Sequence, residues 1–160
     1  MTLVEFMQHL ANGVSLGSLY ALIAIGYTMV YGILRLINFA HGDIFMLGAY
    51  LTYYAIVFTS MPWYVAFALA AAITGLVGFL LEKIAYKPLR DAQRITVLIS
   101  AIGASFFLQN FATVVFGGRP KAFPIPSIMN KIINIGGVSI NLITFIIPVI
   151  GLGLLAGLTY

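Results

Sequence analysis

The most constraining feature of this sequence is a series of long apolar runs, most of them long enough to cross a membrane, that hold almost no charged side chains. The first run, residues 10–34, contains none. Only 8% of the 160 residues are charged, against about 25% in soluble domains, so lipid must be the main solvent of the chain. The sequence predicts an all-α membrane protein, a multi-span bundle of transmembrane helices with spans at about residues 10–34, 36–59, 63–81, 95–116 and 138–160.

A polar block, Asn38-Phe39-Ala40-His41-Gly42-Asp43, lies at the start of the second predicted span. The apolar run after it, residues 44–58, would be roughly 22 Å long as a helix, which is short of a hydrocarbon core of about 30 Å. A span that begins at Leu36 reaches roughly 34 Å. We therefore expect the second helix to include the polar block and to be broken or re-entrant there.

Ionisable side chains at membrane depth face protein or water and mark functional sites, so we predict that a bend at Asn38, His41, Gly42 and Asp43 lines a solute pathway. The same side chains could instead hold helix ends together, with Asn38 or Asp43 capping a helix that starts near Ile44. Both interpretations stay open from the residues alone.

The fourth predicted span carries a polar stripe. Ser105, Gln109 and Thr113 recur every four residues and so share one face of a helix, with Asn110 on an adjoining arc. We expect the polar arc to face the protein interior and the apolar arc, which includes Val97 and Leu108, to face lipid. Ser105, Gln109 and Asn110 are candidates for the pathway wall, although hydrogen bonds between helices explain such a face equally well.

Several kinds of site are absent from the sequence. There is no cysteine, which excludes disulfides, thiolate metal sites and thiol catalysis. No G-x-x-x-x-G-K-[ST] motif is present, so the chain does not bind ATP through a P-loop. Metal binding would need more ligands than His9, His41 and Asp43 supply. A serine hydrolase built on Ser105 and a distant histidine has only a short, common pattern in its favour, so we predict no catalytic residue.

The net charge of +4 bears on orientation in the membrane rather than on nucleic acid, for which we expect no role. With five crossings, Arg35 shares one side with the four basic residues of the loop at residues 82–94. Arg119, Lys121 and Lys131 share the other side. The more basic side is expected to be cytoplasmic, which places the N-terminus outside.

The chain resembles, almost from end to end, the permease subunit of bacterial branched-chain amino acid ABC importers. The block at residues 38–43 in its hydrophobic setting is the most specific match. The matching pieces are Asn12-Gly13 to Gly17, Tyr20-Ala21-Leu22, Gly26, residues 31–43, Gly48-Ala49-Tyr50, Pro88-Leu89-Arg90 within residues 82–90, Ile102-Gly103, Leu108-Gln109-Asn110 and Phe116-Gly117.

The resemblance implies a multi-pass protein of the bacterial inner membrane that forms the translocation pathway for leucine, isoleucine, valine or a related amide or short amphipathic solute. Its partners would be a second permease subunit, two cytoplasmic ATPase subunits that bind the ATP, and a periplasmic amino-acid-binding protein. The chain itself would be no enzyme and would hold no cofactor. Family members are nearly twice as long, so we expect residues 1–160 to be a single, incomplete transmembrane domain, the N-terminal portion of a permease.

A proton-coupled carrier or channel subunit that uses Asp43 and His41 as titrating groups is the alternative of a different class. Its transport would depend on a proton gradient and would continue without ATPase subunits.

Overall fold

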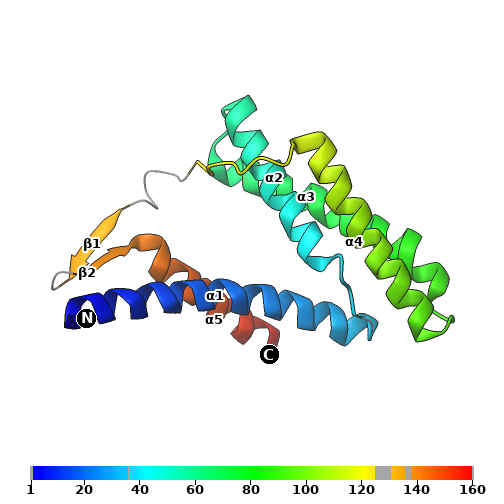
Figure 1. Cartoon of the computed structure of the whole chain (residues 1–160), viewed down its shortest axis with the longest axis horizontal. Coiled ribbons are helices and arrows are strands. Elements are labelled where there is room, and N and C mark those ends of the chain that lie inside the picture. Colours follow the sequence, from blue (N-terminus) through cyan, green and yellow to red (C-terminus); the bar gives the residue numbers. More distant parts are fainter. Residues whose placement is uncertain (1, 36, 125–130, 136–137, 160) are drawn as a thin grey trace. The chain divides into compact units, whose positions relative to one another are not determined.

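The computed structural model describes residues 2–35, 37–124, 131–135 and 138–159, and it is mainly helical (Figure 1). Within these residues, four helices are long and apolar enough to cross a membrane, and a fifth apolar helix is shorter. This confirms the prediction of an all-α, multi-span membrane protein. In chain order the elements are α1 (Leu3–Leu34), α2 (His41–Thr59), α3 (Trp63–Leu81), η1 (Glu82–Tyr86), η2 (Lys87–Leu89), α4 (Arg94–Phe116), β1 (Ile132–Ile135), β2 (Val138–Asn141) and α5 (Leu142–Thr159).

The second span begins later than the sequence suggested. Helix α2 starts at His41, and its 19 residues rise about 28 Å, close to the thickness of a hydrocarbon core. The helix is continuous from His41 to Thr59, so the expected break within the second helix is not observed. The polar block is therefore divided: Asn38, Phe39 and Ala40 precede the helix, and the other three residues form its first turn. In the connection between α1 and α2, Arg35 has a φ of 52° and donates its backbone N–H to the carbonyl of Tyr31 at 2.7 Å.

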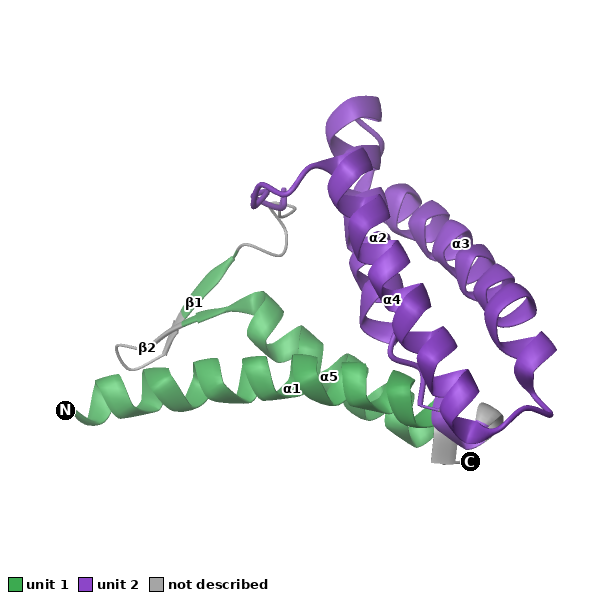
Figure 2. Ribbon diagram, turned by 45° about the vertical axis from the view of Figure 1, so that its right-hand side comes forward, with its two compact units in different colours: residues 1–29, 125–160 green, residues 30–124 purple. Residues whose placement is uncertain are grey.

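The chain divides into two compact units, one of residues 1–29 with 125–160 and one of residues 30–124 (Figure 2). The sequence suggested one transmembrane domain for the whole chain. The two units are described separately below and are called unit 1 and unit 2.

Unit 2 contains α2, α3 and α4, which lie side by side in Figures 1 and 2. Close approach of α2 to α3 depends on Gly48, because a Cβ there would lie 3.2 Å from Oγ1 of Thr74. Helix α3 passes into a π-helical turn, η1, and a 3₁₀ turn, η2, before α4 begins. Two small clusters form the buried core of the unit: Ala40, Leu47, Leu108 and Ala112 in one, and Tyr86, Val97 and Ala101 in the other.

The expectation for the faces of α4 is wrong in part. Val97 and Leu108 of the apolar arc are turned inward, at 3% and 5% exposed, and Gln109 and Asn110 are exposed. Ser105 of the polar stripe does face the interior, where it donates to Asp43 of α2. The small side chain of Ala101 allows close helix packing on the buried side. The exposed amide of Asn110 hydrogen-bonds the carbonyl of Phe106, so its polarity is largely satisfied within its own helix.

In unit 1, the segment expected to open a fifth span is a strand. Strands β1 and β2 pair antiparallel, with Ile132 opposite Asn141 and Ile135 opposite Val138. The sequence of β2, Val138-Ser139-Ile140-Asn141, alternates apolar and polar residues. A period of two residues is typical of a strand and not of a helix. The fifth helix therefore begins at Leu142 and has 18 residues.

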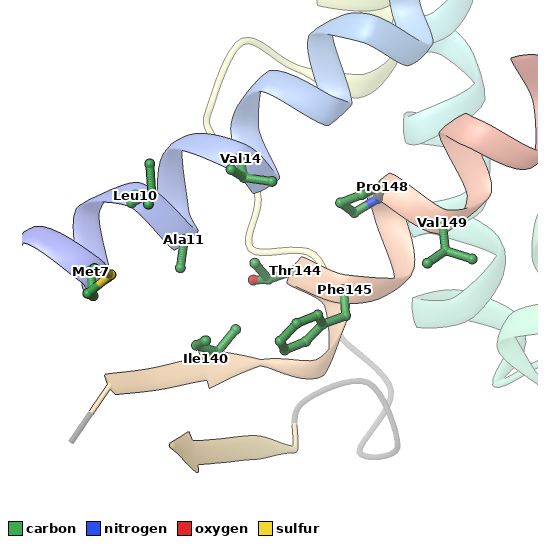
Figure 3. A pocket seen from close by; sticks show the side chains of 9 residues that line it. All are labelled: Met7, Leu10, Ala11, Val14, Ile140, Thr144, Phe145, Pro148 and Val149. Atoms are coloured by element: carbon green, nitrogen blue, oxygen red, sulfur yellow. The ribbon is translucent and has the colours of Figure 1, made fainter. Parts of the chain in front are cut away.

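Helix α5 packs on α1 within unit 1. A Cβ on Gly151 would lie 3.7 Å from the side chain of Leu22, an ordinary contact distance. Nearer the N-terminus of α1, the two helices and β2 enclose an apolar cleft of about 600 Å³ (Figure 3). Pro148 lies inside α5, and its missing N–H leaves the carbonyl of Thr144, on the wall of this cleft, without its usual helical donor.

Candidate functional site

Asn38 is the centre of the hydrogen bonding at one end of unit 2. Its Oδ1 accepts the backbone N–H of Ala40 at 3.0 Å and the hydroxyl of Tyr86 at 2.7 Å. Its carbonyl accepts the N–H of His41 at 3.2 Å. Asn38 is 8% exposed and Tyr86 is 5% exposed, so little water reaches these groups. The Asn38 side chain thus joins the start of α2 to η1, a contact suited to holding helix ends together.

Asp43 joins α2 to α4. Its Oδ2 accepts the hydroxyl of Ser105 at 2.5 Å, and the hydroxyl oxygen of Ser105 accepts the side-chain N–H of Gln109 at 3.2 Å. Asp43 does not cap its helix, because no side-chain hydrogen bond closes the N-terminus of α2. Its negative charge in the first helical turn nevertheless interacts favourably with the positive end of the helix dipole. The structure therefore brings together three residues that the sequence singled out on two different spans.

A cavity of about 320 Å³ opens beside Asn38, and half-buried His41 lies on its wall. Glu82 also lines it and forms an ion pair with Arg90, whose guanidinium lies 3.2 Å from the carboxylate. The wall therefore offers an amide, an imidazole, a carboxylate and a phenol, set among aliphatic side chains. Its lining residues are Val30, Asn38, His41, Ile44, Gly78, Glu82 and Tyr86.

Two predicted site residues lie outside this arrangement. Asn110 is exposed, and its side chain donates to the carbonyl of Phe106, 2.7 Å away on its own helix. Gly42 lies inside α2, and a Cβ there would meet no atom of the described residues within 4 Å, so packing against these residues does not require a glycine at this position. The residue with a left-handed backbone in the connection between α1 and α2 is Arg35, not Gly42.

Tyr86 and Glu82 were not among the predicted site residues. They belong to residues 82–94, which the sequence predicted to be a basic loop and which is the most charged segment of the chain. The available signal was local: Ala85-Tyr86 is an apolar pair between charged residues, and a buried tyrosine usually has a hydrogen-bond partner. The π-helical turn that directs Tyr86 toward Asn38 has no comparable signature in the sequence.

An aromatic cluster joins the C-terminal half of α2 to the C-terminal end of α4. The hydroxyl of Tyr54 donates to the carbonyl of Phe116 at 3.1 Å, and the rings of Tyr50 and Phe116 stack with centroids 4.8 Å apart. The ammonium of Lys121 lies 5.1 Å from the centroid of the Tyr54 ring and 5.8 Å from that of Tyr53. A hydrogen bond with Tyr54 raises the pKa of Lys121 above its ordinary value, which favours the charged form.

The polar groups of unit 2 are suited to binding. Within the part of the chain that the structure describes, no group of three or more His, Asp or Glu side chains could hold a metal ion. What the site offers is hydrogen-bonding and charged groups buried between apolar helices. Such groups can hold a polar solute or fix the relative positions of helices.

Fold and site together define a class: a multi-span helical membrane protein with polar side chains buried between its helices. The family model described as the branched-chain amino acid transport system permease component matches residues 9–160. The chain belongs to this family of transport permeases.

Individual relatives agree with the family match. The chain is 40% identical to the high-affinity branched-chain amino acid transport system permease protein BraD of Pseudomonas aeruginosa over 97% of its length and 54% of BraD. It is 46% identical to the corresponding protein LivH of Escherichia coli K12 over 74% of its length and 41% of LivH, and equally to LivH of Salmonella typhimurium. The chain thus spans about half the length of the curated relatives it matches. No solved structure matches it.

Proposed function

We propose that this chain forms part of the solute pathway of an ABC importer for branched-chain amino acids. The family match over residues 9–160 is the observation that carries the proposal. The names of its relatives supply the solute class, since BraD and LivH are branched-chain amino acid transport permeases. The chain would carry out no catalytic step and would hold no cofactor, and ATP would be bound by partner subunits.

The geometry of unit 2 supports a role in the pathway for the polar block. A branched-chain amino acid has two charged groups and an aliphatic side chain, so its route needs polar groups beside apolar walls. The cavity beside Asn38 has both, with the carboxylate of Glu82 and the imidazole of His41 on the same wall as Val30 and Ile44. Asp43 and Ser105 lie at the adjoining contact of α2 with α4. We propose that this end of the unit contacts the solute in one state of the transport cycle.

The rest of the assembly follows from the family resemblance. The proposed partners are a second permease subunit, two cytoplasmic ATPases and a periplasmic binding protein that delivers the amino acid, all in the bacterial inner membrane. Closure of the ATPases would switch the cavity between outward and inward openings, which requires contacts that differ between the two states. Arg35 and residues 82–94 would lie on the cytoplasmic side.

Reconstitution tests the proposal. The permease is purified with its candidate ATPases and a second permease, placed in proteoliposomes, and supplied with loaded binding protein. We expect uptake of labelled leucine that requires ATP on the ATPase side and continues when the proton gradient is collapsed. Uptake that persists without the ATPases and follows the proton gradient would support the carrier alternative, in which Asp43 and His41 titrate.

The absence of cysteine makes a second test direct, because every introduced thiol is the only one in the chain. We expect cysteines at Asn38, His41 or Asp43 to react with an aqueous maleimide in at least one state of the cycle. Lys87→Cys, at an exposed position, is the reactive control, and Phe107→Cys, on the exposed apolar face of α4, is the unreactive control. If all positions of the block resemble Phe107→Cys in every state, the block does not line a pathway.

A further inference from the structure

A second cavity in unit 2 carries two arginines. It has a volume of about 200 Å³ and lies where α1 ends and α4 begins. It shares no lining residue with the cavity beside Asn38. Its walls are formed by Tyr31, Arg35, Ile37, Arg94, Val97 and Leu98.

Neither arginine is paired with a carboxylate in the part of the chain that the structure describes. The ion pair found there joins Arg90 to Glu82, neither of which lines this cavity. Asp91, the acid nearest to Arg94 in the sequence, is exposed and forms no ion pair among the described residues. Two arginines therefore line one cavity, and among the described residues neither forms an ion pair with a carboxylate.

The backbone at Arg35 gives independent support for a role of its side chain. Its φ of 52° lies in the left-handed region, and its N–H bonds the carbonyl of Tyr31, as at many helix C-termini. Glycine takes this conformation without steric penalty and is the usual residue there. A large side chain held in a disfavoured conformation points to a function for that side chain.

The surroundings of the cavity are those of a membrane interface. One candidate span ends at Gly32, and another begins at Arg94 itself, an arrangement that would place both arginines near the level of lipid head groups. Tyr31, an exposed aromatic residue at a helix end, is typical of this level. Ile37, Val97 and Leu98 provide apolar contacts for the start of an acyl chain. Lys83 and Lys87 follow α3 in the same charged connection that leads to Arg94, and such basic clusters attract anionic lipids.

We propose that Arg35 and Arg94 bind the phosphate of an anionic phospholipid, with its glycerol backbone and upper acyl chains against the apolar wall. Guanidinium groups suit this ligand because their planar forks donate bidentate hydrogen bonds to phosphate oxygens. The site is separate from the solute pathway and does not depend on the proposed transport function.

Native mass spectrometry of the full chain, purified in a neutral detergent, tests the site. The probes are phosphatidylglycerol, which is anionic, and phosphatidylcholine, which has no net charge. We expect the wild type to retain phosphatidylglycerol in preference. Arg35→Gly and Arg94→Gln should each weaken that binding on the order of fivefold, the effect of one basic residue at an anionic membrane surface. Arg90→Gln removes one charge from the same connection outside the cavity and should leave binding unchanged.

The choice of Arg35→Gly protects the test from misfolding, because glycine relieves the backbone while removing the guanidinium. Arg94→Gln, at an exposed helix start, gives a second reading, and circular dichroism checks the helix content of each variant. The proposal is overturned if the Arg35→Gly/Arg94→Gln double variant binds phosphatidylglycerol like the wild type. It is also overturned if Arg90→Gln weakens binding equally, which indicates general charge attraction, or if inorganic phosphate at the same concentration displaces the lipid, which indicates a free-anion site.

Discussion

Replacing Asn38 by alanine tests whether the polar block holds the helix ends together. The side-chain oxygen of Asn38 accepts two hydrogen bonds, from the N–H of Ala40 and from the hydroxyl of Tyr86. Ala40 is fully buried, and Tyr86 is 5% exposed. Water therefore cannot easily replace the lost acceptor, and the substitution leaves two buried donors without their partner.

The expected loss follows from these contacts. A buried donor left without a partner costs about 1–3 kcal/mol, so the loss of a partner for two donors in Asn38→Ala should lower the free energy of unfolding by about 2–6 kcal/mol. Tyr86→Phe removes one hydroxyl and leaves the oxygen of Asn38 bonded to Ala40. That single loss should be about 1 kcal/mol, within the range measured for hydrogen bonds between membrane helices.

The assay is unfolding of the purified chain in mixed micelles with increasing dodecyl sulfate, followed by circular dichroism. The double variant Asn38→Ala/Tyr86→Phe should be less destabilised than the sum of the single variants, by about 1 kcal/mol, because both remove the same bond. Asn110→Ala is the matched control, since its exposed amide bonds only the carbonyl of Phe106 in its own helix. It should change stability by less than about 0.5 kcal/mol.

Two results would refute this reasoning. Asn38→Ala could be no more harmful than Asn110→Ala, in which case the buried bonds of Asn38 do not stabilise the fold. The losses at Asn38 and Tyr86 could instead add without any coupling. The contact between them would then contribute nothing, and the position of η1 would depend on packing alone.

Three further substitutions test neighbouring contacts. Ser105→Ala removes the hydroxyl that donates to Asp43 and should lower unfolding free energy by about 1–3 kcal/mol in the same assay, with Ser105→Thr closer to the wild type. Gly48→Ala places a Cβ 3.2 Å from Oγ1 of Thr74 and should cost about 1–3 kcal/mol, an effect that added Thr74→Ala reduces. Lys121→Met removes the cation held over two tyrosine rings and should speed proteolysis of the adjoining segment, measured by mass spectrometry of the fragments.

The spans could be predicted from sequence because lipid imposes a simple requirement. A helix satisfies its own backbone hydrogen bonds, and its length must match the hydrocarbon core, so long apolar runs identify it without knowledge of its neighbours. The break predicted within the second span is not observed, because α2 runs without interruption from His41 to Thr59 and the polar block lies at its start. The position of that start was not predictable, since the helix start at His41 depends on bonds made by Asn38 to a residue 48 positions away.

The faces of α4 show a different limit. Periodicity correctly groups residues into stripes, but it does not say which stripe meets the protein. Asn110 and Thr113 bond carbonyls four residues earlier in their own helix, so polar side chains can face outward at modest cost. Val97 and Ala101 can meanwhile occupy the interior because their small side chains allow the helices to pack closely. For that reason, hydrophobicity alone assigned the buried apolar residues of α4 to its lipid-facing side.

The sequence predicted several residues of the site, but it did not predict which of them form hydrogen bonds with one another. Asp43 and Ser105 were each singled out, one as a carboxylate at membrane depth and one as part of a polar stripe. Their hydrogen bond spans 62 positions and required the packing of α2 on α4. Tyr86 lies in a charged segment where a single aromatic residue gives little signal, and its contact with Asn38 depends on the irregular helical turn of η1.

The hydrogen bonds between α2 and α4 are weak enough for these two helices to move relative to each other. Asp43 bonds Ser105 at one level of the helix pair, and Tyr54 bonds the carbonyl of Phe116 at another. Hydrogen bonds between membrane helices average about 0.6 kcal/mol and reach about 1.7 kcal/mol, so separating both contacts costs on the order of 1–3 kcal/mol. That is the size of a typical coupling free energy between two sites in allosteric proteins. Contacts of this strength specify one arrangement of the helices, yet a partner or solute that binds another arrangement slightly better can shift the equilibrium. If α2 and α4 separate in the proposed transport cycle, variants that lack both bonds should therefore favour the separated arrangement while the helices themselves stay folded.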